Sequence, residues 1–545
     1  MKTALIISVS ALALVACSNE TSGDGGIQIA QVDETTAASA LEALHLADSG
    51  EGAVSWESRT FDGGIYTFNG LTFTMPEDAD DDDSGEEGEL TASTNTFTAD
   101  TMTLAGPRFD DDGNVVFDRL AINTIALGVD DDDFDGTISS FIIEEPNSDL
   151  ALSIAHGFSG DASDDDDFDT GDWTYGLFAL EDLNIIGTDD ENVFTVSLGR
   201  FVIDDLSEYS IAHFELMDFV IEGADDEVGI IEFRLDEMSA DGIGQALTYP
   251  FAAQFAMMGT AMSGNGSDGD ITEDVPELPE DYDPLDAYDR AAIRGLNANI
   301  GGIMIQLDSL TAETREDGNN VRYVSEMTPL IITPDSNYTL GAQMAMGLGM
   351  LSYDQLEFVA GGSSVYDRDA DRAYTDGENY FEMRDGFRIE VDSDMTGLLA
   401  YSIAAMQVGY SMDEPDPAQI MTMLEPLILN NFSFRLQDES LLDRALTAAS
   451  AMQGMPKDQL RMQAGAMIAL GMMGAPAEIP RPLLTEFSTA MTTFIANGGS
   501  VEVNIAPDQP VSVAELVAQA QAGNLDYEAM GISITAIPPE GETNE

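Results

Sequence analysis

Four carboxylates between positions 367 and 378 have the spacing of a calcium-binding loop. Asp367, Asp369, Asp371 and Glu378 fall at positions 1, 3, 5 and 12 of an EF-hand-like loop, where oxygen ligands for Ca²⁺ are expected. Arg372 occupies the sixth position, where such a loop needs glycine, and no clear helix follows. The alternative interpretation is an acidic surface loop. The sequence therefore gives a calcium site here as a hypothesis only.

Runs of consecutive aspartates also offer hard oxygen ligands. They occur at 80–83, 110–112, 130–133 and 164–167. Consecutive aspartates do not converge on one ion as alternating ones can, and most runs lie where a turn is expected; Asp112-Gly113 is a typical hairpin-turn pair. We expect them to form a solvated acidic surface, with calcium binding as the alternative.

Residue types that carry catalysis are sparse. The chain has three histidines, His45, His156 and His213, and none has a partner at metal-ligand spacing. There is no Gly-x-Ser-x-Gly motif, and the Gly-x-Gly-x-x-Gly match at 264–269 follows a predicted helix rather than a strand. Paired carboxylates cannot be recognised among 102 acidic residues. We therefore expect a protein that is not an enzyme and that needs no cofactor.

The only cysteine of the chain, Cys17, closes a short apolar leader. One positive charge at Lys2 is followed by an apolar stretch to Ala16, which is typical of a signal peptide and too short to span a bilayer. The residues Leu14-Val15-Ala16-Cys17 resemble a bacterial lipobox. That resemblance implies cleavage before Cys17 and acylation of this residue, which would bind the protein to a membrane. Ser18, rather than aspartate, implies the outer membrane, facing the periplasm.

The charge of the chain is extreme. It has 102 acidic and 19 basic residues, a formal net charge of −83, while 44% of its residues are hydrophobic. The hydrophobic content predicts a folded core, and the negative charge excludes nucleic-acid binding because phosphates would be repelled. Salt would screen the repulsion between the acidic groups, so an acidic surface suits a salty exterior.

An apolar pattern recurs along the chain: apolar, any, apolar, any, any, apolar, any, apolar. Between 178 and 240 the copies start 18, 18 and 19 residues apart. These copies are Phe178, Leu180, Leu183, Ile185; Val196, Leu198, Phe201, Ile203; Phe214, Leu216, Phe219, Ile221; and Phe233, Leu235, Met238, Ala240. Weaker copies are Tyr66, Phe68, Leu71, Phe73; Phe97, Ala99, Met102, Leu104; Val115, Phe117, Leu120, Ile122; Ile305, Leu307, Leu310, Ala312; Leu351, Tyr353, Leu356, Phe358; and Leu427, Leu429, Phe432, Phe434.

Each copy predicts one bent strand with an apolar and an acidic face. Alternation places the apolar side chains on one face of a strand. The two consecutive "any" positions in the middle of the pattern, called here the double gap, interrupt this alternation. A β-bulge or sharp bend is required there to keep the second half on the same face. The pattern is palindromic, so neighbours that run in opposite directions can match, which favours an antiparallel meander.

The second half adds helices. Segments 251–262, 338–350, 398–410, 441–453, 460–472 and 483–497 lack alternation and are rich in Ala, Met and Leu. We expect strands at 500–506 and 531–537 and a short helix at 513–522. The predicted organisation is a leader (1–16), a tether with a short helix (17–50), a β-repeat region (51–250), an acidic proline-containing linker (263–284), a mixed region (285–537) and a disordered tail (538–545). The fold class is α+β, with a large curved antiparallel sheet and helices inserted in its second half.

This arrangement resembles the YdgA-like and AsmA-like periplasmic proteins of Gram-negative bacteria in its pattern of repeats. The resemblance implies a long curved sheet, sometimes with an apolar groove, and carries no site residues across. A sheet with one apolar face must be covered by helices, a partner or a ligand. We therefore expect an envelope protein that binds an apolar or lipid molecule between sheet and methionine-rich helices, with a groove in the first half. The alternative is a structural or interaction protein with a closed core and an acidic outer face.

Overall fold

The computed structural model describes residues 27–76, 94–128, 134–160, 173–189, 192–207, 209–225, 229–249, 282–409, 417–473 and 479–539. The chain divides into two compact units, Met1–Pro276 and Glu277–Glu545. Several predicted features lie outside the described residues: Cys17, the glycine motif at 264–269, the helix at 251–262, and the aspartate runs at 80–83, 130–133 and 164–167.

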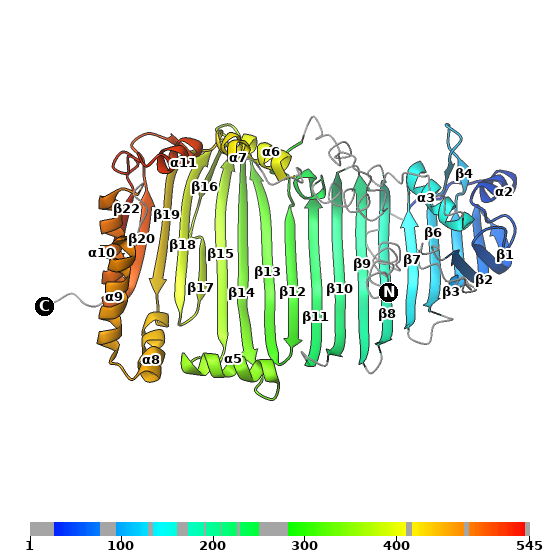
Figure 1. The fold of residues 1–545 in the computed structure, drawn as a ribbon. Coiled ribbons are helices and arrows are strands. Elements are labelled where there is room, and N and C mark those ends of the chain that lie inside the picture. Colours follow the sequence, from blue (N-terminus) through cyan, green and yellow to red (C-terminus); the bar gives the residue numbers. More distant parts are fainter. Residues whose placement is uncertain are drawn as a thin grey trace, which may run out of the picture. The chain divides into compact units, whose positions relative to one another are not determined.

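The first unit contains an antiparallel meander (Figure 1). Its strands pair in the order β1, β2, β3, β6, β7, β8, β9, β10 and β11, so each long strand lies beside the next in the chain. Their bounds are Val54–Asp62, Ile65–Pro76, Thr94–Ala105, Arg119–Leu127, Phe134–Glu144, Tyr175–Asp189, Asn192–Ser207, Ser210–Asp225 and Gly229–Ile243. The predicted antiparallel sheet is confirmed.

The repeat copies pair position by position. Phe178 of β8 pairs with Ile203 of β9, and the following apolar positions pair as Leu180 with Phe201, Leu183 with Leu198 and Ile185 with Val196. The same match recurs between β10 and β11, from Phe214 with Ala240 to Ile221 with Phe233. The palindromic pattern thus sets the register of the meander, because only this register places all apolar side chains on one face.

A bend, without a shift in register, restores the apolar face in the first unit. Asp182 of β8 and Asp218 of β10 lie at the second residue of the double gap and have left-handed backbone conformations, with φ of 51° and 52°. Thr124 does the same in β6, and Gly70 in β2. Pairing continues in one register on both sides of each bend.

Two predicted copies of the pattern were wrong, because each began several residues before the long strand begins. In the first, Val115 lies in the short strand β5 (Val115–Val116), which pairs with β4 (Arg108–Phe109) around Gly113. The long strand starts at Arg119, and its apolar positions are Leu120, Ile122, Ile125 and Leu127. In the second, Leu351 caps the end of helix α5 (Thr339–Met350), and the strand starts only at Leu356. The first apolar residues of these two copies belong to the hairpin of β4 and β5 and to the end of α5, not to the strands that follow.

Two helices cover the apolar face of the first unit, where the sequence predicted only the earlier one. Helix α2 (Glu34–Ala43) starts at Asp33, whose Oδ1 accepts hydrogen bonds from the N–H groups of Thr35 and Thr36. Helix α3 (Ser148–Ser159) starts at Asn147 in the same way. Both helices pack against the apolar side chains of the recurring pattern. Together they form one core, whose largest fully buried members include Phe68, Leu71, Met102, Leu120 and Leu180. Each such side chain contributes about 1.5–3 kcal/mol. The apolar face is therefore closed over β2, β3, β6 and β7, whereas most apolar pattern side chains of β10 and β11 are only half-buried.

The second unit contains another antiparallel sheet. Its pairing order is β12, β13, β14, β15, then the short strands β16 and β17, then β18, β19, β20 and β22, with β21 beside β19. The bounds are Arg290–Ile300, Ile303–Asp317, Asn320–Pro334, Leu356–Asp367, Arg372–Thr375, Tyr380–Met383, Phe387–Thr396, Ile428–Asp438, Gly499–Ile505, Ser533–Ile537 and, for β21, Val511–Ser512.

The predicted β-bulge occurs in this sheet. The register between β14 and β15 shifts between Met327 and Leu330, and that between β18 and β19 shifts after Asp394. At the first shift, Thr328 Oγ1 accepts a hydrogen bond from Ser309 N–H and donates one to the Ser309 carbonyl, over 2.7 and 2.8 Å. The Thr328 side chain thus takes the place of backbone pairing with Ser309, which lies opposite it between the paired residues Leu307–Leu330 and Leu310–Met327.

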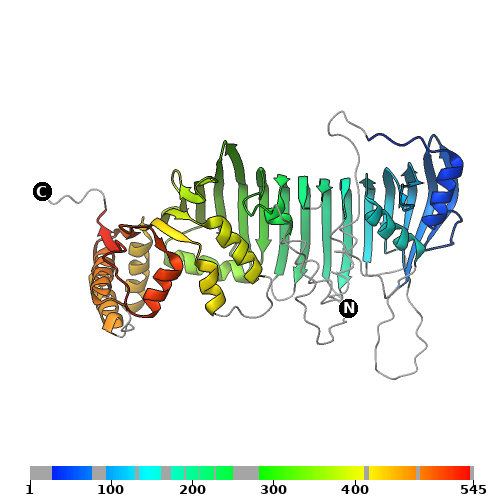
Figure 2. The same ribbon diagram turned by 90° about the horizontal axis from the view of Figure 1, so that it is seen from above.

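Most predicted helices of the second half are confirmed: α5, α6 (Leu398–Gly409), α8 (Leu441–Gln453), α9 (Lys457–Met473), α10 (Arg481–Asn497) and α11 (Val513–Gln521). Helix α7 (Pro417–Leu424) was not predicted. In the second unit, α5 lies at one end of the strands and α6 with α7 at the other, on the same side of the sheet (Figures 1 and 2). None of the described helices is long and apolar enough to cross a bilayer. The fold class is α+β, as predicted.

Candidate functional site

The structure does not gather the four carboxylates of the predicted calcium loop. Asp367 Oδ1 accepts hydrogen bonds from the N–H groups of Asp369 and Ala370, which forms a tight turn between β15 and β16. Glu378 lies beyond β16, where its carboxylate pairs with Arg388 of β18 at 2.8 Å.

Asp371 also holds other partners. Its Oδ1 accepts hydrogen bonds from the Tyr366 hydroxyl, 2.9 Å away, and from Leu399 N–H, 3.1 Å away. Burial and this hydrogen bond raise the pKa of Tyr366 well above its usual value. Among the described residues, no group of three or more His, Cys, Asp or Glu side chains is arranged to hold a metal ion. The geometry gives the calcium hypothesis no support at this loop.

The histidines lie apart from one another along the first unit. His213 of β10 pairs with Asp241 of β11 through Nδ1 and Oδ1, 2.7 Å apart, on the polar side of the strand. His156 lies in α3, and His45 follows α2 in a left-handed conformation, with φ of 54°. Of the three, His213 thus has a cross-strand partner in Asp241.

A hollow of about 460 Å³ lies at the break between β16 and β17 in the second unit's sheet, and most of its lining residues lie on the apolar face. Side chains that share this face by register include Tyr323 and Ser325 of β14, Ala360 of β15, Phe381 of β17 and Ile389 of β18. Its complete lining is Tyr288, Tyr323, Val324, Ser325, Ala360, Gly361, Gly362, Ser363, Ser364, Asn379, Tyr380, Phe381, Ile389 and Val391. None of these residues is charged, although 22% of the residues of the chain are.

Small residues in the middle of β15 create the space. The segment from Ala360 to Ser364 has no large side chain, so tyrosine and phenylalanine rings on neighbouring strands form the walls. Glycines inside a strand often mark a place where another group approaches closely. Here Asn379 approaches Gly362, because a Cβ on that glycine would lie 2.6 Å from Asn379 Oδ1.

The rim of the hollow is held by hydrogen bonds. Asn379 Oδ1 accepts a hydrogen bond from Ser363 N–H of β15 at 2.5 Å, and the backbone carbonyl of Asn379 accepts one from Val391 N–H of β18 at 3.0 Å. The break between β16 and β17 thus stays joined to both neighbouring strands. The Tyr323 hydroxyl donates to the Leu285 carbonyl at 3.0 Å. Burial, aided by the Asp283 carboxylate, raises the pKa of Tyr323 to about 12, so this donor is kept at neutral pH.

Helix α5 closes the face at one end of the hollow. Its residues Met344 and Leu348 pack with Phe358 and Phe387 of the sheet. The ring of Phe381 stacks on Phe358 with centroids 5.6 Å apart, yet Phe381 keeps 40% of its surface exposed. The packed cluster therefore ends at Phe381, and the apolar face beyond it is open to the hollow.

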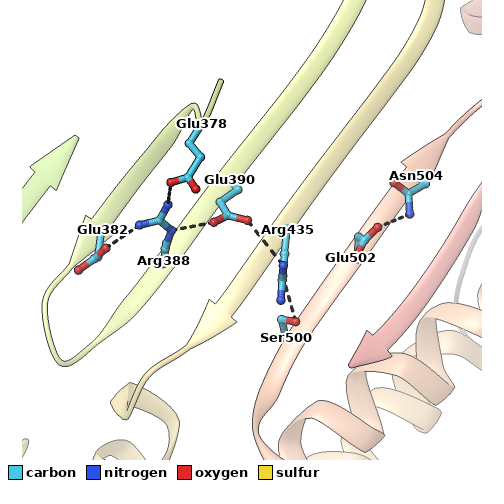
Figure 3. Close-up of polar contacts among 8 residues, drawn as sticks. All are labelled: Glu378, Glu382, Arg388, Glu390, Arg435, Ser500, Glu502 and Asn504. Carbon is cyan, nitrogen blue, oxygen red and sulfur yellow. Dashed lines mark hydrogen bonds and ion pairs between the residues drawn. The ribbon is translucent and has the colours of Figure 1, made fainter. Parts of the chain in front are cut away.

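The opposite face of the same sheet is polar and carries a chain of ion pairs (Figure 3). The Arg388 guanidinium donates to Glu378, Glu382 and Glu390 at 2.8, 3.0 and 2.8 Å, and it lies 4.1 Å from the centre of the Tyr380 ring. Arg435 continues the chain to Glu390, at 3.8 Å, and its Nε donates to Ser500 Oγ at 3.3 Å. These charges are satisfied by one another, which stabilises the sheet and leaves the uncharged hollow as the candidate site.

The comparisons with known proteins add no activity. A family model described as "Uncharacterized protein" matches residues 380–537, which include Phe381, Ile389 and the ion pairs of Arg388 with Glu382 and Glu390. A comparison with curated proteins finds no match. The resemblance to YdgA-like and AsmA-like proteins stays a prediction.

Sequence reasoning missed the hollow. Its walls come from segments as far apart as Tyr288 and Val391, which no local pattern connects. One signal was available: the run Ala360-Gly361-Gly362-Ser363-Ser364 separates the apolar residues Phe358 and Val359 from Val365 and Tyr366 within one strand. That run marks the floor of the site.

Proposed function

We propose that this protein is a non-enzymatic, lipid-anchored protein of the cell envelope, and that its second unit binds an apolar or lipid molecule in the hollow beside Phe381. The uncharged hollow itself carries the proposal. Its volume of about 460 Å³ falls within the roughly 300–1,000 Å³ typical of sites for small ligands.

The lining matches such a ligand. Tyr288, Tyr323 and Phe381 offer ring surfaces, and Ile389 and Val391 add aliphatic contacts. The hydroxyls of Ser325 and Ser364 can orient a polar end of the molecule. Because no charged group lines the site in a chain of net charge −83, an ionic ligand would gain no counter-charge there.

The anchor belongs to the same proposal. The lipobox-like residues ending at Cys17 support acylation, and Ser18 supports the outer membrane, with the protein facing the periplasm. A membrane anchor would keep an apolar-ligand binder close to a source of lipid.

Filling the hollow tests the proposal. Ala360→Leu adds a branched side chain to its floor and should weaken the binding of N-phenyl-1-naphthylamine, a neutral apolar fluorophore, by about tenfold or more. The control is Ala298→Leu, at a half-buried alanine of β12 outside the lining. Fluorescence titration of the wild type and both variants gives the three dissociation constants.

The proposal fails if the wild type does not bind the fluorophore, or if both variants bind it as the wild type does. Native mass spectrometry of gently purified protein gives a second measurement, since a bound lipid should be present in the wild type and depleted in Ala360→Leu.

The closed core of the first unit favours a second candidate, a structural or interaction protein of the envelope. Helices α2 and α3 pack in one core with the apolar side chains of β2, β3 and β6, so this part of the sheet offers its outer face, rather than a groove, to a partner. This candidate is preferred if no fluorophore and no lipid bind. Its acidic, calcium-binding version further requires stoichiometric Ca²⁺ uptake at high salt that Asp369→Ala abolishes.

A further inference from the structure

Residues 441–497, which carry α8, α9 and α10, are electrically neutral in a strongly acidic chain. They contain four acidic and four basic side chains, namely Asp443, Asp458, Glu478, Glu486, Arg444, Lys457, Arg461 and Arg481. The whole chain has 102 acidic and 19 basic residues. The segment itself therefore adds no net charge that an anionic lipid surface would repel.

Two of the four cations of this neutral helical segment, Lys457 and Arg461, form ion pairs within it. Lys457 Nζ lies 2.7 Å from Asp443, and Arg461 lies 3.4 Å from Asp443 and 3.8 Å from Asp458. Arg444 lies over the ring of Tyr353, 4.2 Å from its centre. The segment therefore has no excess of positive charge with which to select anionic groups.

The same segment exposes large apolar side chains. On α9, Met462, Met467 and Leu470 keep 69%, 62% and 65% of their surface exposed, and Met452 at the end of α8 keeps 73%. Met462, Ala466 and Leu470 follow one another at four-residue spacing, so they form a continuous stripe on the helix. Methionine side chains adapt to irregular apolar surroundings.

A groove of about 470 Å³ lies beside this stripe, between α9 and α10. Gly465, Ala466, Thr492 and Ala496 line it with small groups, and the ion pair of Asp458 with Arg461 lies at its edge. One anion and one cation next to an apolar groove are complementary to a zwitterionic headgroup and its acyl chain.

We propose that the exposed face of α9, centred on Met462, Met467 and Leu470, docks on a zwitterionic phospholipid surface. This contact is separate from the hollow beside Phe381 and does not depend on acylation of Cys17. A second copy of the chain fits the face less well, because it would bring another net charge of −83 close to the first. Stable dimers also bury about 20–30 residues on each side, far more than this stripe offers.

Vesicle flotation tests the contact. Residues 17–545 with Cys17→Ser are mixed with phosphatidylcholine vesicles in about 0.15 M salt, where charges are screened beyond roughly 8 Å. We expect the protein to float with the vesicles, and the triple variant Met462→Gln, Met467→Gln, Leu470→Gln to lower the vesicle affinity by roughly tenfold or more. Replacing part of the phosphatidylcholine with phosphatidylglycerol should weaken binding of the wild type.

The matched control is Ile186→Gln, Val193→Gln, Met238→Gln, at exposed apolar positions of the first unit. Circular dichroism checks that all variants fold alike. The inference is overturned if the wild type does not float, if the control loses as much affinity as the α9 variant, or if anionic vesicles bind more tightly. It is also overturned if sedimentation shows a dimer that the α9 variant dissociates, since a second copy would then occupy the face. Fluorophore binding in the hollow should be equal in all these proteins, so failure here leaves the proposed function untouched.

Discussion

Asp394 of β18 is a carboxylate whose surroundings favour its charged form. Arg372 donates to its two oxygens at 2.8 and 2.6 Å, and Asn430 Nδ2 donates at 3.0 Å. The Arg372 hydrogen bond, more than any other contact, holds the pKa of Asp394 below its usual value. A bidentate arginine pair of this kind joins β16 to β18 and fixes the region next to the predicted calcium loop.

We therefore expect Asp394→Asn to destabilise the protein by about 1 kcal/mol at neutral pH. Because the folded pKa is lowered, the contribution of the carboxylate is fully present above the unfolded pKa of about 3.9 and is lost as the pH falls through the folded value. Urea unfolding of wild type and variant between pH 7 and pH 3 should show a constant difference that shrinks below about pH 4.

Asp335→Asn is the control for that series, since the carboxylate of Asp335 accepts hydrogen bonds from Asn337 rather than from an arginine. A difference for Asp394→Asn that stays the same down to pH 3, or that grows on acidification, would contradict the assigned role of Arg372.

At the scale of the strand, the left-handed residues in the double gaps are the parts most sensitive to side-chain type. Asp218 has φ of 52° in the middle of β10. Its Cβ faces Gly199 of β9, where an added Cβ would lie only 2.9 Å away. Aspartate tolerates the left-handed region, whereas a β-branched residue is strained there.

Asp218→Val should therefore destabilise the first unit by about 1–3 kcal/mol. Asp236→Val is a matched control, because Asp236 is an exposed aspartate at the double gap of β11 and its φ is not left-handed. That variant should stay within about 0.5 kcal/mol of the wild type. Urea midpoints of the two variants give the comparison, and equal losses would show that the bend does not depend on the left-handed residue.

The same strands show how far the sequence alone predicts this fold. The recurring apolar pattern predicts which side chains share a strand face, and its palindromic order agrees with the observed pairing register. One register alone keeps Leu180 and Leu183 on the apolar face with Phe201 and Leu198. The predicted strand starts were wrong at Val115 and Leu351. A hairpin precedes the strand in the first case, and a helix end precedes it in the second. Local apolar spacing does not distinguish a strand from the chain reversal that precedes it.

The candidate site was less predictable than the strands. The spacing of Asp367, Asp369 and Asp371 suggested calcium, but a turn between two strands uses Asp367 for its own backbone hydrogen bonds. The hollow depends on strands that meet only after pairing, so Tyr323 and Phe381 could not be connected from the sequence. Local apolar spacing predicts which face of a strand is buried. It does not predict where the helices and neighbouring strands leave that face uncovered.

At the scale of the whole molecule, the distribution of charge is more informative than its sum. A net charge of −83 would repel anionic lipid, yet the hollow is lined without a charged residue and residues 441–497 carry equal numbers of acidic and basic groups. Neither surface that we assign to apolar molecules carries a net negative charge, because the hollow has no charged lining residue and Asp458 at the α9 groove is accompanied by Arg461. Such a chain stays soluble through its acidic surface and can still contact lipid at neutral places.

An acidic chain of this kind needs more than a small apolar face to stay on a membrane. The exposed face of α9 offers three large side chains, Met462, Met467 and Leu470, and a contact of that size is reversible and lost on dilution. Acyl chains add about 0.8 kcal/mol for each buried CH₂ group, so acylated Cys17 would dominate the attachment. Cys17→Ser should therefore move the protein from the washed membrane fraction to the soluble fraction of expressing cells. Met462→Gln alone is the control and should leave the acylated protein on the membrane. If Cys17→Ser stays membrane-bound after washing, or if mass spectrometry finds Cys17 of the wild type unmodified, the lipid anchor is wrong and the envelope assignment loses its main support.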